Sequence, residues 1–262
     1  MPLNPRIIAA VTRVSSVSEA PRPAWLPASK ARRLDPLAVM MCTTVDQLGP
    51  AWHAETAVVV GTAWGCVAST HRFTEDLREH GDAGGSPAAF TASVHHHPAG
   101  VLGELLNLHG PVATISSGGS SGLAALRWAL LMVGSGRAPE AMVIAADLAN
   151  PWVSQMAAVP GGCPFPIGGG VCALRVGLAA SGRLFGIGAR GEGPWCDAGG
   201  ATPAEERAFA AAGERRRSAA AIHRQWWPSA ALAAVAWDAV GPCDVRERGG
   251  RQDLDVWIGR QP

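Results

Sequence analysis

The chain has 262 residues, of which 48% are hydrophobic and 16% are charged, so it can bury a large core and does not have the composition of a disordered protein. Its 22 basic residues nearly balance its 21 acidic residues, which excludes a strong electrostatic attraction to nucleic acid or to an anionic membrane. No segment reaches about 18 uninterrupted apolar residues, and we expect a cytoplasmic protein without a membrane partner.

The first third of the chain predicts alternating strands and helices. Residues 6–14 are rich in β-branched side chains and predict a strand. Prolines interrupt residues 20–36, which we expect to be an exposed connection. Residues 34–49 have the spacing of an amphipathic helix, with Pro36 near its start and Gly49 at its end. The short apolar run at 56–65 is typical of a buried parallel strand.

The middle of the chain continues this alternation. A polar helix is predicted at 69–85, with Ser69 and Thr70 as candidate caps. A second helix is predicted at 98–110, with Pro98 in its first turn and Gly110 at its end. A strand at 112–116, a helix at 122–136, and strands at 140–149 and 168–178 follow. This order predicts an α/β fold with a doubly wound or three-layer pattern.

The last third is richer in alanine, glycine and charge. Residues 202–227 predict one helix or two, residues 231–240 a short helix or strand, and residues 253–259 a last edge strand. No internal repeat is present. We therefore expect a main domain at 1–193 and a C-terminal extension at 194–262 that packs on the same domain.

The glycine- and serine-rich stretch between the strand at 112–116 and the helix at 122–136 matches a serine-hydrolase motif. Residues 118–122 read G-G-S-S-G, and the hydrolase elbow G-x-S-x-G likewise lies between a strand and a helix. Ser120, Asp147 and His223 would then form a triad in the chain order of that fold. Two points weigh against a hydrolase. A run of glycines and serines often matches this motif by chance, and His223 lies in an alanine-rich helical stretch instead of the loop after a last strand, where a triad histidine is expected.

Cysteine and histidine residues give no metal-site pattern. The six cysteines include no C-x-x-C pair, so we expect reduced thiols, and Cys163 reads as a loop thiol. His95, His96 and His97 are adjacent, and three consecutive side chains cannot all point the same way on a strand or helix. We expect no metal there, and a role at a pocket rim or an interface.

Residues 90–149 resemble the ketosynthase family of the thiolase fold, and more narrowly its short chain-length-factor-type members of aryl-polyene-like biosynthesis. In those proteins a Phe-Ser-Val-His segment leads to a helix, "GP", a strand, and a Ser-Ala-Gly motif in place of the nucleophilic cysteine. Here the first segment is carried by Phe90, Ser93, Val94 and His95, and the second by Ser116, Ser117 and Gly118. The resemblance runs over about residues 6–180, and it implies a three-layer α/β/α arrangement comprising the N-terminal half-fold only.

The same resemblance bears on the nucleophile. Counting from Gly110-Pro111 aligns the ketosynthase nucleophile with Gly119, which is flanked by Ser117, Gly118 and Ser120. Glycine has no side chain, whereas acyl transfer needs a thiolate at the N-terminus of the following helix. Neither of the two histidine motifs that assist decarboxylation in the family is present, and His96 aligns with the family's asparagine. The chain alone is therefore not expected to be a catalyst.

The function implied is that of a ketosynthase-like or chain-length-factor subunit. It would form a heterodimer with an active ketosynthase and help shape the tunnel for the acyl chain, in type II polyketide, aryl-polyene or fatty-acid-like biosynthesis. An acyl carrier protein would bring the chain to the partner, and no cofactor is implied. The pocket or interface residues expected are Phe90, His95, His96, Val112, Thr114 and Ser116, because the family pairs the strand before the corner across a two-fold axis. A stand-alone homodimer that binds acyl groups is the third hypothesis.

Overall fold

The computed structural model of the chain describes residues 5–13, 22–49, 51–117, 121–148 and 170–178 and five later strands, and it contains one ten-stranded sheet. Its first part runs in the order β3 (Val112–Ile115), β2 (Ala57–Gly61), β4 (Glu140–Asp147), β5 (Gly170–Gly177) and β1 (Arg6–Arg13). β2 pairs in parallel with β3 and with β4, whereas β5 is antiparallel to β4 and to β1. All five strands were predicted from the sequence.

The sheet continues beyond β1 into the C-terminal part of the chain. The next strands are β6 (Arg183–Ile187), β10 (Leu254–Gly259), β9 (Cys243–Glu247), β7 (Trp195–Asp197) and β8 (Arg217–Ser218). One prediction is wrong here: β10 pairs with β6 on one side and β9 on the other and so is not an edge strand. β8 excludes a single continuous helix over 202–227, while the other residues of that range and residues 231–240 lie outside the described residues.

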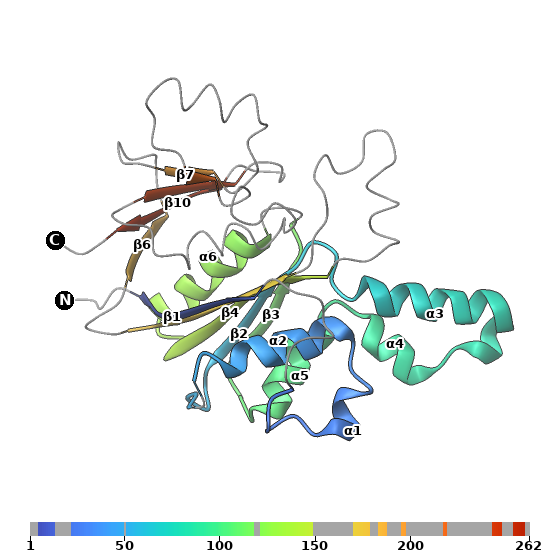
Figure 1. Ribbon diagram of the computed structural model, residues 1–262. Coiled ribbons are helices and arrows are strands. Elements are labelled where there is room, and N and C mark those ends of the chain that lie inside the picture. Colours follow the sequence, from blue (N-terminus) through green and yellow to red (C-terminus); the bar gives the residue numbers. More distant parts are fainter. Residues whose placement is uncertain are drawn as a thin grey trace, which may run out of the picture.

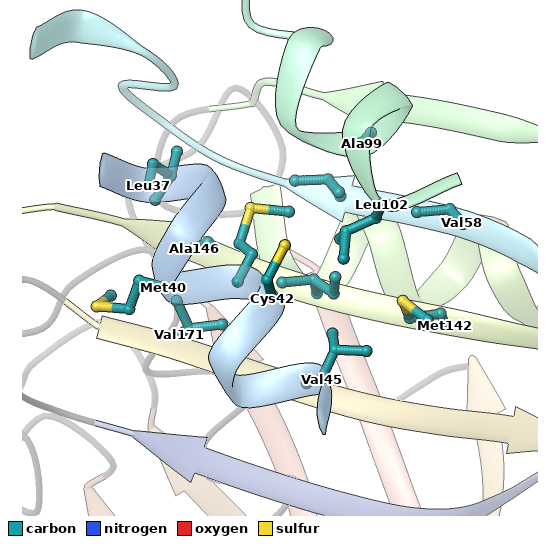
Figure 2. Close-up of a cluster of buried hydrophobic side chains, with 14 of the residues drawn as sticks. Leu37, Met40, Cys42, Val45, Val58, Ala99, Leu102, Met142, Ala146 and Val171 are labelled. Atoms are coloured by element: carbon teal, nitrogen blue, oxygen red, sulfur yellow. The ribbon is translucent and has the colours of Figure 1, made fainter. Parts of the chain in front are cut away.

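Helices cover the two faces of the first five strands (Figure 1). α2 (Pro36–Asp46) and α5 (His97–Leu105) lie on one face and α6 (Ser121–Gly134) on the other. Side chains alternate along each strand, so Ala57 and Val59 of β2 pack with α6, while Val58 and Val60 pack with α2 and α5. Figure 2 shows the second of these clusters. The three-layer α/β/α prediction is therefore confirmed.

The ends of the helices follow local chemistry, with one correction. Asp35 caps α2 by accepting a hydrogen bond from the Leu37 N–H at 2.8 Å, with Pro36 next to it as predicted. α5 ends before Gly110, because Asn107 takes the left-handed conformation that terminates it, at φ 53°. Gly110 serves another purpose: a Cβ there would lie 2.4 Å from the backbone oxygens of Glu55 and Thr56.

A pair of helices stands beside the sheet (Figure 1). α3 (Val67–His80) begins two residues before the predicted cap Ser69, whose hydroxyl instead donates to Asp35. The 3-10 helix η2 (Gly81–Gly84) leads into α4 (Pro87–Ser93), which the sequence analysis missed. The expected connection at 20–36 also holds the four-residue helix α1 (Ala28–Ala31). α3 and α4 lie on the side where β2, β3 and β4 end (Figure 1).

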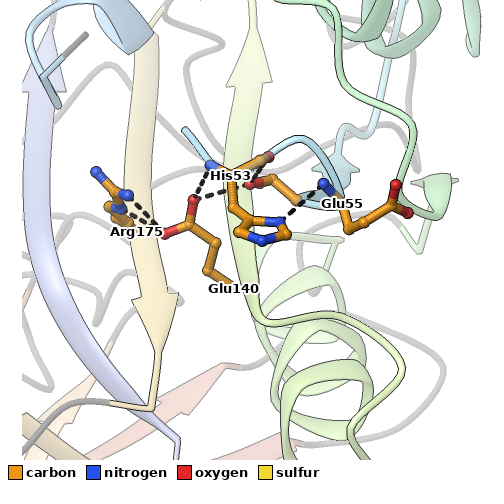
Figure 3. Close-up of polar contacts among 5 residues, drawn as sticks. His53, Glu55, Glu140 and Arg175 are labelled. Carbon is orange, nitrogen blue, oxygen red and sulfur yellow. Dashed lines mark hydrogen bonds and ion pairs between the residues drawn. The ribbon is translucent and has the colours of Figure 1, made fainter. Parts of the chain in front are cut away.

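At the opposite end of the strands, Glu140 joins the chain entering β2 to β4 and β5 (Figure 3). One carboxylate oxygen accepts the His53 N–H and the Thr56 hydroxyl, each at 2.8 Å. The other lies 2.6 Å from a guanidinium nitrogen of Arg175, which also stacks over the Trp52 ring at 4.6 Å. The carboxylate is thus fully paired in a largely buried place.

Replacing Glu140 with alanine should lower the free energy of unfolding by roughly 2–3 kcal/mol, because it leaves the Arg175 charge and two donors without their acceptor. Glu140→Gln keeps one acceptor oxygen and should cost about 1 kcal/mol. Urea unfolding of the purified variants measures both changes. No loss in Glu140→Gln beside a full loss in Glu140→Ala would mean that the packing volume, and not the ion pair, supplies the stability.

Candidate functional site

The predicted corner lies where parallel strands β2, β3 and β4 end at the same edge of the sheet. This edge carries the loop at 62–65 after β2, the residues that follow β3, and Asp147 at the end of β4. Carboxyl ends of parallel strands are the usual place for sites in α/β proteins. Gly118, Gly119 and Ser120, at the apex of the corner, lie outside the described residues, as does His223.

The described flanks of the corner are held together by Ser121, the first residue of α6. Its hydroxyl accepts the Ser117 N–H at 2.9 Å and donates to the Thr62 carbonyl at 3.1 Å. Gly61, the last residue of β2, lies against the start of α6, where a Cβ would be 2.3 Å from the Ser121 carbonyl oxygen. The glycine therefore lets β2 and the start of α6 approach closely, and this contact positions the strand–turn–helix. The sequence analysis did not identify Gly61 or Ser121, although Gly61 was visible as the glycine that ends an apolar strand.

Asp147 is completely buried and holds the loop after β2. Its Oδ1 accepts hydrogen bonds from the Thr62 hydroxyl at 2.9 Å, the Trp64 N–H at 2.8 Å and the Ala63 N–H at 3.1 Å. The Thr62 oxygen in turn accepts the Gly65 N–H at 2.7 Å. Burial raises the pKa of Asp147 to about 7, against the lowering effect of the donors on Trp64, Ala63 and Thr62. Its described bonds serve the loop, and the Ser120–Asp147–His223 triad stays a prediction.

The three adjacent histidines have three different surroundings. The His95 ring lies against Gly65, where a Cβ would be 2.6 Å from two ring carbons. His96 places Nδ1 3.4 Å from the Thr114 hydroxyl of β3. His97 begins α5, and burial lowers its pKa against the opposing charges of Asp35 and Glu104. Among the described residues, no three histidine, cysteine or acidic side chains gather closely enough to hold a metal ion.

The outer side of β3 and the neighbouring helix α4 carry predicted pocket or interface residues. Val112 and Thr114 belong to β3, whose residues are all partly exposed, and no described strand pairs with its outer edge. Ser116 follows β3 and directs its hydroxyl to the Ala63 carbonyl at 3.5 Å. Phe90 lies on α4 with 57% of its surface exposed and contacts Phe73 of α3, with ring centroids 5.7 Å apart. His96 thus connects the strand edge to the helices beside it.

The described cysteine side chains, those of Cys42, Cys66 and Cys172, are buried. Burial raises the pKa of Cys42 to about 12, and burial, assisted by the charge of Asp35, raises the pKa of Cys66 further. Since the thiolate is the reactive form, neither could act as a nucleophile near neutral pH. Cys163 lies outside the described residues.

Comparisons with known proteins agree with this architecture. Residues 9–179 match the family described as β-ketoacyl synthase, N-terminal domain. No curated protein matches the chain significantly. Within the described residues, none of the helices has the length and apolar character needed to cross a membrane.

Solved structures similar to this chain are ketosynthases and their complexes. The ishigamide ketosynthase/chain length factor is 18% identical with a TM-score of 0.70, over 97% of this chain and 98% of that chain. A ketosynthase in complex with its chain length factor, from Xenorhabdus doucetiae, is 14% identical with a TM-score of 0.64, over 98% of this chain and 100% of that chain. A type II PKS acyl-carrier protein in complex with its ketosynthase is 12% identical with a TM-score of 0.70, over 98% of this chain and 99% of that chain. At these identities the likeness concerns the fold.

Proposed function

Because the chain belongs to the family of β-ketoacyl synthase N-terminal domains and has the thiolase-like fold of ketosynthases and chain length factors, we propose that it is a catalytically inactive, chain-length-factor-type subunit. It forms a heterodimer with an active ketosynthase. Together the two subunits enclose the tunnel for the growing acyl chain in type II polyketide, aryl-polyene or fatty-acid-like biosynthesis.

The residue at the corner carries this proposal. Gly119 lies where the register from Gly110-Pro111 aligns the ketosynthase nucleophile, between β3 and the N-terminus of α6. A thiolate at that place would gain from the positive end of the helix dipole and from nearby N–H groups. Glycine offers no atom that could attack a thioester. The described flanks nevertheless keep the strand β3 and the helix α6, as expected of a subunit whose role is shape and not chemistry.

The outer edge of β3, with which no described strand pairs, supports a partner that adds a strand. The Val58 N–H donates to the Pro111 carbonyl at 2.9 Å, and the Thr62 N–H donates to the Ile115 carbonyl at 3.0 Å. In a parallel ladder alternate residues bond to the same neighbour. Val112 and Thr114 therefore direct their N–H and C=O groups away from β2. An unpaired edge of this kind favours association with another strand.

The other parts of the proposal follow from this pairing. Phe90, His95, His96 and Ser116 would lie at the rim of the interface or of the tunnel. An acyl carrier protein would deliver the acyl chain to the cysteine of the partner, so this subunit would need no cofactor of its own. Residues 1–193 would provide the ketosynthase-like domain and residues 194–262 its extension, in a cytoplasmic complex.

Co-expression with the ketosynthase of the same gene cluster tests the proposal. The two chains should copurify as a one-to-one heterodimer that condenses carrier-protein-bound acyl groups, whereas this chain alone should be inactive. The matched control is the ketosynthase with a cysteine-to-alanine change, which should preserve the complex and abolish condensation. Activity of the ketosynthase that is unaffected by leaving this chain out would contradict the proposal.

The same preparations separate the two other hypotheses. A serine hydrolase should be labelled by a fluorophosphonate at Ser120 and lose the label in Ser120→Ala; on the proposed function no label is expected. A stand-alone binding protein should form a stable homodimer without the ketosynthase, which sedimentation of the isolated chain would reveal.

A further inference from the structure

The loop at 62–65, here called the edge loop, contacts every element around the candidate site. Asp147 of β4 accepts its N–H and hydroxyl donors. Ser121 of α6 donates to the Thr62 carbonyl, and Ser116 after β3 donates to the Ala63 carbonyl at 3.5 Å. The His95 ring lies against Gly65, which permits the close approach because it has no Cβ. The edge loop therefore links buried β4 to the outer face at β3.

Asp147 is the anchor of this loop, and its described surroundings carry no positive charge. The edge loop presents only neutral donors to it, and β5 places Gly170 opposite it in the ladder. α6 contributes the neutral Ser121 to the same loop, which runs on into the buried thiol of Cys66. A carboxylate removed from water without a cation is costly, while its donors favour the ionised form. Because burial favours the protonated form and the donors favour the ionised form, the two forms of Asp147 lie close in free energy.

We propose that Asp147 is a positioning residue whose proton occupancy sets the edge loop and, through Ser116 and His95, the outer face beside β3. The ionised carboxylate can accept from every loop donor and holds the loop tightly. Protonation removes the cost of the buried charge but converts one acceptor site into a donor facing the Ala63 N–H, which lies 3.2 Å from Oδ2. The consequence for a partner at that face rests on the proposed function; the proton linkage does not.

The sign of the linkage follows from burial. Burial raises the pKa of Asp147 from 3.8 to about 7, so the folded chain keeps a proton that the unfolded chain has released. The stability contributed by this proton is present below about pH 4 and is lost as the pH rises toward 7. Across that window the ratio of folded to unfolded chain should fall by up to about tenfold per pH unit.

Urea unfolding of the wild-type chain and of Asp147→Asn from pH 5 to pH 8 tests the linkage. Other titrating groups such as His97 are common to both proteins, so they cancel in the difference. The wild type should lose stability relative to Asp147→Asn as the pH rises to 7, and the difference should level off above 7. Two curves that stay parallel over this range would overturn the proposal.

An infrared titration of the wild-type chain covers the case in which Asp147→Asn does not fold. A buried protonated carboxyl band should disappear near pH 7, and Thr62→Val, which removes one donor to Asp147, should move that midpoint to higher pH. No such band between pH 5 and pH 8 would likewise overturn the proposal.

The role in positioning has its own readout. With a ketosynthase partner, the affinity of the wild type should change several-fold more between pH 6 and pH 8 than that of Asp147→Asn. The histidines of the outer face and the titrating groups of the partner are common to both measurements, so they cancel in the difference. A pH response equal in both proteins would refute positioning. A complete failure to bind would instead count against the proposed function and leave the unfolding and infrared results to decide the linkage.

Discussion

Alanine at position 61 should prevent the chain from folding stably, with a loss of at least about 3 kcal/mol in the free energy of unfolding. The new Cβ would lie 2.3 Å from the Ser121 carbonyl oxygen and 2.6 Å from its carbonyl carbon. These atoms belong to the backbone at the start of α6 and cannot rotate away, so either β2 or the helix must shift. The measurement is the urea midpoint, or the soluble yield if no folded protein remains.

Gly100→Ala is the matched control for this experiment. Gly100 is exposed in α5, and a Cβ there has nothing within 4 Å. Because alanine favours the helix over glycine, this variant should gain about 1 kcal/mol. If Gly61→Ala unfolded at the midpoint of the wild type, the close approach of β2 and α6 could not be what positions the corner.

Proline at position 114 should abolish the proposed heterodimer, weakening the affinity for the ketosynthase at least about 100-fold through the lost strand pairing. The Thr114 N–H points away from β2, since Pro111 and Ile115 are the residues that accept from β2. The substitution therefore removes a donor at the free edge and leaves the ladder between β2 and β3 intact. Binding measured by surface plasmon resonance gives the loss directly.

Two further variants separate edge pairing from general damage. Thr114→Val retains the backbone N–H but loses the hydroxyl that meets His96, and it should bind within a few-fold of the wild type. Ala113→Pro removes a backbone N–H that faces β2, so it should destabilise the chain itself. Wild-type affinity in a folded Thr114→Pro variant would show that β3 does not pair with the partner.

The layers of the fold could be predicted because they depend on local periodicity. The apolar run ending at Gly61 and the spacing of residues 34–49 indicated a buried strand and an amphipathic helix, and β2 and α2 lie within those ranges. The family resemblance, and not periodicity, implied that the strand at 112–116 lies at an edge, and β3 lies at the end of the strand order. By contrast, β6, β7 and β9 are short strands stabilised by pairing with distant segments, and no local sequence pattern predicted them.

The candidate site was predicted in part. The resemblance identified the corner and the residues at the outer face, and Thr114 and His96 do meet there. It could not reveal that Asp147 is wholly enclosed by the edge loop, because the three donors come from residues more than eighty positions earlier. Glu140 was missed for the same reason, since its partners His53, Thr56 and Arg175 come from separate segments.

By itself, the amino-acid sequence determined which segments form the central strands and the helices α2, α5 and α6 that cover them. Periodicity and residue identity are local properties, so they can be read without a fold. Only the tertiary structure decided which buried acid meets which donors and why Gly61 has no room for a side chain. Those outcomes depend on distances between segments that packing alone brings together.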